Sequence, residues 1–92
     1  MNEHHFKIEA PFAAVVDVLV TTSSLHVVEY SEIHFVGTLH AGAGVIARPA
    51  YPNATDVIVA EQDGGSVAVA FAETLARSLG CEVPLANPFE TV

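Results

Sequence analysis

The chain has 92 residues, which is enough for one domain and too few for two, because domains rarely run below about 50 residues. Its net charge of −8, from three basic and 11 acidic residues, excludes duplex nucleic acid, nucleotide phosphates and anionic membranes as partners, since each needs clustered Lys or Arg. The apolar content of 51% exceeds what so small a core requires. We therefore expect a homo-oligomer that buries part of it between subunits.

The location follows from what the sequence lacks. A single cysteine, Cys81, excludes an internal disulfide and fits a reducing compartment. The first residues carry no basic segment of a secretory signal. The longest apolar run, 12–20, is interrupted by Asp17 and is shorter than the roughly 20 residues of a membrane helix. These features predict a cytoplasmic, bacterial-type protein without membrane insertion.

The first two predicted elements lie on either side of Pro11. Residues 4–10 alternate apolar and polar, with Phe6 and Ile8 on one face, and predict a strand. In 12–22 the apolar residues have helical spacing, but many are β-branched and equally fit a strand. We prefer the helix because a proline suits the first helical turn.

Residues 26–39 predict one long strand. Its odd positions Ile33, Phe35 and Leu39 are apolar and are expected to face the core. Its even positions are partly polar. Val28, Tyr30 and Val36 do not belong to the apolar face, and we expect them to form a second core between subunits.

The second half of the chain predicts a loop, a strand, a helix and a strand. Residues 41–55 contain the turn-forming residues Gly42, Gly44, Pro49, Pro52 and Asn53 and predict a long loop, with a short strand piece at 45–47. Residues 56–60 predict a short buried strand. Residues 67–79 predict the best helix, ended by Gly80, and 82–85 an edge strand.

The predicted order is βαββαβ. This α+β, ferredoxin-like arrangement places two helices on one face of a four-stranded antiparallel sheet, within a single domain spanning 1–92. The second face of the sheet then needs a partner.

Histidine residues suggest a metal site. Glu32 and His34 lie two residues apart on one side of the predicted strand and are candidate ligands of a divalent cation, together with His40. His34 and His40 lie about 20 Å apart on a straight strand, so they join one metal only if the chain bends at Gly37 or a neighbouring subunit completes the site. The alternative is that the histidines are surface or interface groups.

The loop 41–55 supplies a second candidate site. Arg48 can bind a carboxylate with two hydrogen bonds, and Tyr51 can stack or donate a hydrogen bond. We therefore expect these two residues to hold a small anionic or planar ligand.

The chain resembles the PII-like superfamily, which includes the nitrogen-regulatory PII proteins and the CutA-type proteins. The resemblance rests on Phe-Lys-Ile-Glu-Ala-Pro-Phe at 6–12, the long strand at 27–39, the extended loop, Asp-Val-Ile-Val-Ala at 56–60 and Cys-Glu-Val-Pro at 81–84. It implies a homotrimer of ferredoxin-like subunits with ligands between them, and a loop at 41–55 that contacts another protein. A second resemblance, to bacterial microcompartment shell proteins, rests on Tyr-Ser-Glu-Ile at 30–33 and Asn-Pro-Phe-Glu at 87–90.

Three functional hypotheses follow. The first is a non-enzymatic, homo-oligomeric regulatory module of the PII-like kind that senses a small ligand or a metal ion. The second is a self-assembling shell or scaffold protein. The third is a small enzyme with an intersubunit site that uses His34 or His40.

Overall fold

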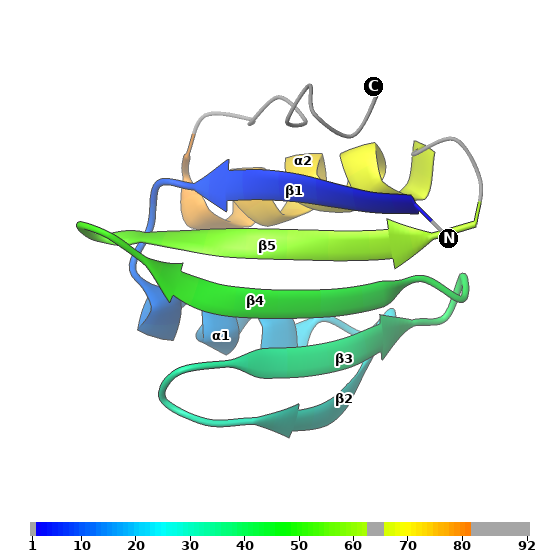
Figure 1. Cartoon of the computed structure of the whole chain (residues 1–92), viewed down its shortest axis with the longest axis horizontal. Helices are drawn as coiled ribbons and strands as arrows, with labels where there is room; N and C mark the ends of the chain where they lie inside the picture. Colours follow the sequence, from blue (N-terminus) through cyan, green and yellow to red (C-terminus); the bar gives the residue numbers. More distant parts are fainter. Residues whose placement is uncertain (1, 63–65, 82–92) are drawn as a thin grey trace.

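The structure is a computed structural model that describes residues 2–62 and 66–81. Seven elements follow one another along these residues (Figure 1): β1 Asn2–Ile8, α1 Phe12–Thr21, β2 Leu25–Tyr30, β3 Phe35–Leu39, β4 Gly44–Ala50, β5 Ala54–Glu61 and α2 Ser66–Leu79. The strand predicted at 82–85 lies outside the described residues.

The strands form one five-stranded antiparallel sheet in the order β1-β5-β4-β3-β2. β2 to β5 form a meander of hairpins, and β1 pairs with β5 at the far edge. Both helices lie behind the sheet in the view of Figure 1, so they cover the same face. The predicted four-stranded ferredoxin-like βαββαβ fold is therefore wrong, because four strands follow one another between the two helices.

Residues 12–21 are helical, which decides between the two alternatives that their sequence allows. Val15, Val16 and Leu19 are buried on the side of α1 that packs on the sheet, because their spacing puts them on one face of a helix. In α2 the buried side includes Phe71 and Leu75. Gly80 follows α2 with a φ of 71°, the left-handed conformation that ends many helices.

The predicted long strand at 26–39 is instead a hairpin of β2 and β3. Ser31 makes the turn: its N–H donates to the carbonyl of His34 at 2.8 Å, and its hydroxyl accepts the N–H of Ile33 at 3.2 Å. The turn removes Ile33 from the core, and its side chain is 71% exposed. Phe35 and Leu39 are buried as predicted.

The predicted loop at 41–55 is mostly strand. Short turns around Gly42 and Pro52 flank β4. Residues 44–47 of β4 pair with both β3 and β5. β3 pairs only with residues 44–47 of β4, so the last residues of β4 have a free edge on the side of β3. Pro49 is accommodated at this free edge. The peptide bond before Pro52 is cis.

The core lies between the helices and one face of the sheet. Its largest fully buried side chains come from both layers and are aliphatic or aromatic, led by Phe35, Ile8, Leu19 and Val15. Gly37 on β3 allows a close approach to β2, because a Cβ there would lie 2.9 Å from the carbonyl oxygen of His26. β3 runs through Gly37 as one strand and pairs with β4 without a shift of register.

Candidate functional site

A cleft of about 650 Å³ opens beside the first turns of α1. We call it the α1 cleft. The end of β2, the β2–β3 turn and the β4–β5 turn form its other walls. It is lined by Phe12, Ala13, Val16, Asp17, Tyr30, Ser31, Glu32, Pro49, Ala50, Pro52, Asn53 and Ala54. This volume lies within the range of roughly 300–1,000 Å³ that is usual for small-molecule sites.

The lining combines an apolar surface with a few polar groups. Phe12 and Tyr30 supply two aromatic rings, and the ring of Tyr30 also packs on Phe35 with centroids 6.3 Å apart. Of the described residues that line the cleft, only Asp17 and Glu32 are charged, and both are acidic. The cleft therefore repels anions and favours neutral or positively charged molecules.

A second hollow, the α2 groove, lies between the end of α1, the β3–β4 turn and one side of α2. Its volume is about 380 Å³. Its lining is aliphatic with many hydroxyls and one imidazole: Val18, Thr22, Ser24, Leu39, His40, Ala41, Ser66, Val67, Ala70, Phe71, Thr74, Leu75 and Ser78. Among the described residues, its lining contains one phenyl ring and no carboxylate, lysine or arginine.

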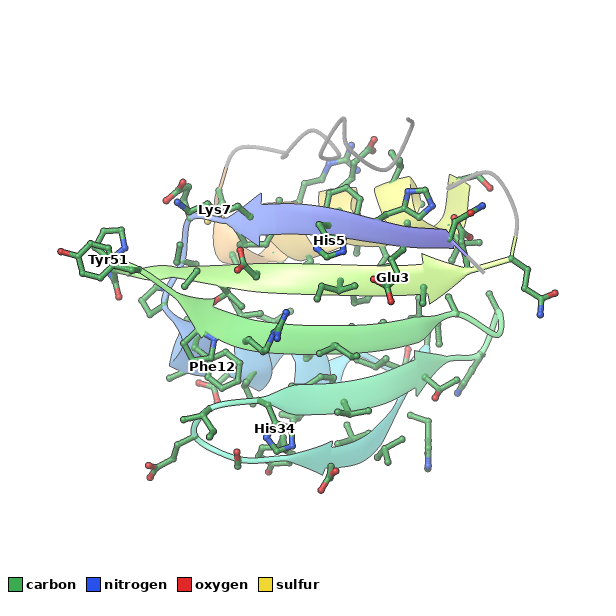
Figure 2. All side chains as sticks on the ribbon, in the orientation of Figure 1. Glu3, His5, Lys7, Phe12, His34 and Tyr51 are labelled. Atoms are coloured by element: carbon green, nitrogen blue, oxygen red, sulfur yellow. The ribbon has the colours of Figure 1, made fainter. Side chains whose placement is uncertain are left out.

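Arg48 and Tyr51, the predicted ligand-binding pair, do not line either hollow. Arg48 is exposed on β4, on the face of the sheet that carries no helix, and is in register with Asp56 of β5. Tyr51 projects from the tip of the β4–β5 hairpin (Figure 2) and is 91% exposed. Their sequence neighbours Pro49 and Pro52 line the α1 cleft, so the predicted segment lies beside a cleft although the predicted residues do not.

The predicted metal ligands are dispersed. Glu32 lines the α1 cleft, whereas His40 lines the α2 groove at the other end of β3. His34 sits beside the β2–β3 turn (Figure 2), with Nδ1 3.1 Å from the hydroxyl of Ser31 and Nε2 3.9 Å from a carboxylate oxygen of Glu29. Within residues 2–62 and 66–81, no three His, Cys, Asp or Glu side chains come together as a metal site.

Two buried polar groups, one on β1 and one on the neighbouring strand β5, were not predicted from the sequence. Glu61 is only 5% exposed, and its carboxylate accepts the backbone N–H of Ala68 in the first turn of α2 at 3.4 Å. His4 places its buried Nε2 3.9 Å from the same carboxylate, outside hydrogen-bond range. The pair is recognisable only once β1 and β5 are known to be neighbours, because 57 positions separate the two residues along the chain.

Cys81 follows α2 and is half-buried rather than fully buried. Its thiol donates to the carbonyl of Glu9 at 3.4 Å, and so links the end of α2 to the segment after β1.

No protein-family model, curated protein sequence or solved structure matches the chain. Among the helices that the structure describes, none has the length and apolar character needed to cross a membrane.

Proposed function

We propose that the chain is a binding module for a small, largely apolar molecule that is neutral or positively charged, held in the α1 cleft. The observation that carries this proposal is the lining of the cleft: two aromatic rings, two prolines and aliphatic carbons, with Asp17 and Glu32 as its only charges. Sites for small molecules have this composition, in which apolar side chains supply area and a few polar groups fix orientation.

The α1 cleft supports this function better than the α2 groove does. It is the larger of the two hollows, at about 650 Å³ against about 380 Å³. Rings such as those of Phe12 and Tyr30 contact planar groups by offset stacking or edge to face, and they attract cations to their faces. The two carboxylates then favour an amine over a carboxylic acid, which reverses the anionic ligand expected from Arg48.

The test uses three sets of small aromatic compounds that differ only in carrying an amine, a hydroxyl or a carboxylate. Saturation-transfer NMR measures which of them contact the protein. We expect the amines and the hydroxyl compounds to bind and the carboxylates to give no signal. Binding of the carboxylates alone, or of none of the compounds, would contradict the proposal.

Two matched tryptophan substitutions, each at an exposed alanine, locate the site. Ala13 is exposed on α1 and lines the α1 cleft, whereas Ala70 is exposed on α2 and lines the α2 groove. Ala13→Trp fills the α1 cleft and is expected to abolish binding, and Ala70→Trp is expected to leave it unchanged. The reverse result would assign the ligand to the α2 groove.

A further pair of variants tests the charge preference. Asp17→Asn and Glu32→Gln keep the size of each side chain but remove its charge. We expect each to weaken binding of the amines about three- to tenfold and to leave the hydroxyl compounds unaffected, because only a charged ligand interacts with the carboxylates.

A further inference from the structure

The face of the sheet that carries no helix has an ordered pattern of side chains. We call this surface the open face; it is turned toward the viewer in Figure 1. Its central row runs across all five strands in register, in the order His5, Ile58, Ile46, Val36 and Glu29. Three aliphatic side chains thus occupy the middle, and a histidine and a glutamate end the row.

Charged and polar side chains lie on both sides of this row. Toward one end of the strands, Lys7, Asp56 and Arg48 are in register on β1, β5 and β4. Toward the other end, Glu3 on β1 and His26 on β2 terminate a row of small residues. The open face therefore has an apolar centre and a polar rim, the arrangement that is usual in protein interfaces.

The charge of the open face differs from that of the rest of the molecule. It carries Lys7 and Arg48, two of the three basic residues of the chain, against three carboxylates. Elsewhere in residues 2–62 and 66–81, Arg77 stands against five carboxylates: Glu9, Asp17, Glu32, Glu61 and Glu73. Two copies of so acidic a protein therefore repel each other less through their open faces than through surfaces that carry the average charge of the remainder.

We propose that the open face is a self-association surface through which two copies of this chain pair face to face. A two-fold axis between the sheets and parallel to β4 places β4 against β4, β5 against β3 and β1 against β2 of the second copy. Ile46 then meets Ile46, and Ile58 meets Val36. At the rim, Glu3 faces His26 and His5 faces Glu29, so both ends of β1 find a complementary group on β2.

The size of the face agrees with this pairing. The molecule measures 30 × 25 × 21 Å, and Figure 1 looks down its shortest axis onto the open face. The outline in that view is at most 30 × 25 Å, so the pairing approaches the roughly 800 Å² per partner of a stable dimer when it covers nearly the whole open face. The two Arg48 side chains lie near the axis, and each has Asp56 in register on the neighbouring strand to offset its charge.

The pairing also revises the predicted second core. Of the three residues expected there, Val36 lies on the open face, whereas Val28 falls at the irregularity of the edge strand β2 and Tyr30 lines the α1 cleft. Self-association through the open face does not depend on the proposed ligand, because the α1 cleft has a separate set of lining residues.

Sedimentation equilibrium between about 1 and about 200 µM tests the proposal, since dimers of this size dissociate in the micromolar range or below. Ile46 on the open face and Val69 on α2 are similarly exposed, at 40% and 43%. We expect Ile46→Glu to raise the dimer dissociation constant at least about thirtyfold and Val69→Glu to leave it unchanged. Far-UV circular dichroism confirms that both variants are folded.

A charge exchange tests the orientation of the two copies. Glu3→Lys and His26→Glu are each expected to weaken the dimer, because each removes the pairing of Glu3 with His26 across the interface. The double variant restores a complementary pair and is expected to recover most of the lost affinity. A monomeric wild-type chain, whatever other protein it binds, or a dimer that Ile46→Glu leaves intact, would overturn the proposal.

Discussion

The two faces of the sheet are made by the same strands but have opposite chemistry. On β3, Phe35 points to the helices and is fully buried, whereas its neighbour Val36 points to the open face and stays partly exposed. On β4, Val45 and Ile46 divide in the same way. Alternation along a strand therefore gives the helix-covered face an almost purely apolar surface, which holds the fold, and gives the open face a charged and apolar pattern suited to a partner.

The largest difference between the faces is expected at Phe35 and Val36. Phe35→Ala removes a fully buried ring and leaves a cavity, and we expect it to lower the free energy of unfolding by about 3–5 kcal/mol. Val36→Ala is expected to cost about 1 kcal/mol or less, because the side chain has no helix above it. Urea denaturation at low protein concentration measures both. Equal losses would mean that the open face contributes to the monomer core.

A smaller effect is expected where β2 and β3 approach each other. A Cβ on Gly37 would meet His26 oxygen at 2.9 Å and carbons of Phe35 and Leu25 at 3.0 and 3.1 Å. We expect Gly37→Ala to destabilise the protein by about 2 kcal/mol, because backbone must shift to admit the methyl group.

Gly44 on β4 is the matched control for this substitution. A Cβ there meets nothing within 4 Å, and its φ is not positive. Gly44→Ala is expected to be neutral or to stabilise by a few tenths of a kcal/mol, because alanine restricts the unfolded chain. If the two variants unfold at the same urea concentration, the close contact at Gly37 is not a constraint on the fold.

The smallest effect is expected at Glu61, the one carboxylate among the described residues that is buried. Glu61→Ala removes the acceptor of the Ala68 N–H at the start of α2, and we expect a loss of about 1 kcal/mol. Glu73→Ala, on the exposed side of α2, removes only a pairing with Arg77 and is expected to cost about 0.5 kcal/mol or less. Thermal denaturation of both variants checks the order, and a larger loss at Glu73 would contradict it.

Local patterns in the sequence predict the elements better than their arrangement. The two helices begin and end within one residue of their predicted bounds, because apolar spacing, Pro11 and Gly80 mark them directly. The hairpin at 30–35 was missed because its turn contains neither glycine nor proline and depends on hydrogen bonds of Ser31. Only the piece of β4 at 45–47 was predicted as strand, because Gly44 and Pro49 resemble loop residues although both fit within a strand.

The candidate site was harder to predict than the elements. The α1 cleft joins residues from α1, the β2–β3 turn and the β4–β5 turn, and these become neighbours only in the correct strand order. Of the residues expected to bind a ligand or a metal, only Glu32 lines this cleft, while His40 lies at the α2 groove and Arg48 on the open face. The sequence indicated what these side chains could bind. Their positions were predicted wrongly because the predicted strand order was wrong.

The pairing of β1 with β5 affects the order in which the chain folds. β2 to β5 join neighbours in sequence, so each of their hairpins closes a short loop. By contrast, Asn2 pairs with Glu61, and bringing them together first would cost the entropy of closing a loop that spans most of the described chain. We expect the four-strand meander to assemble before β1 arrives, so the free edge of β5 is exposed to other chains until the last strand covers it.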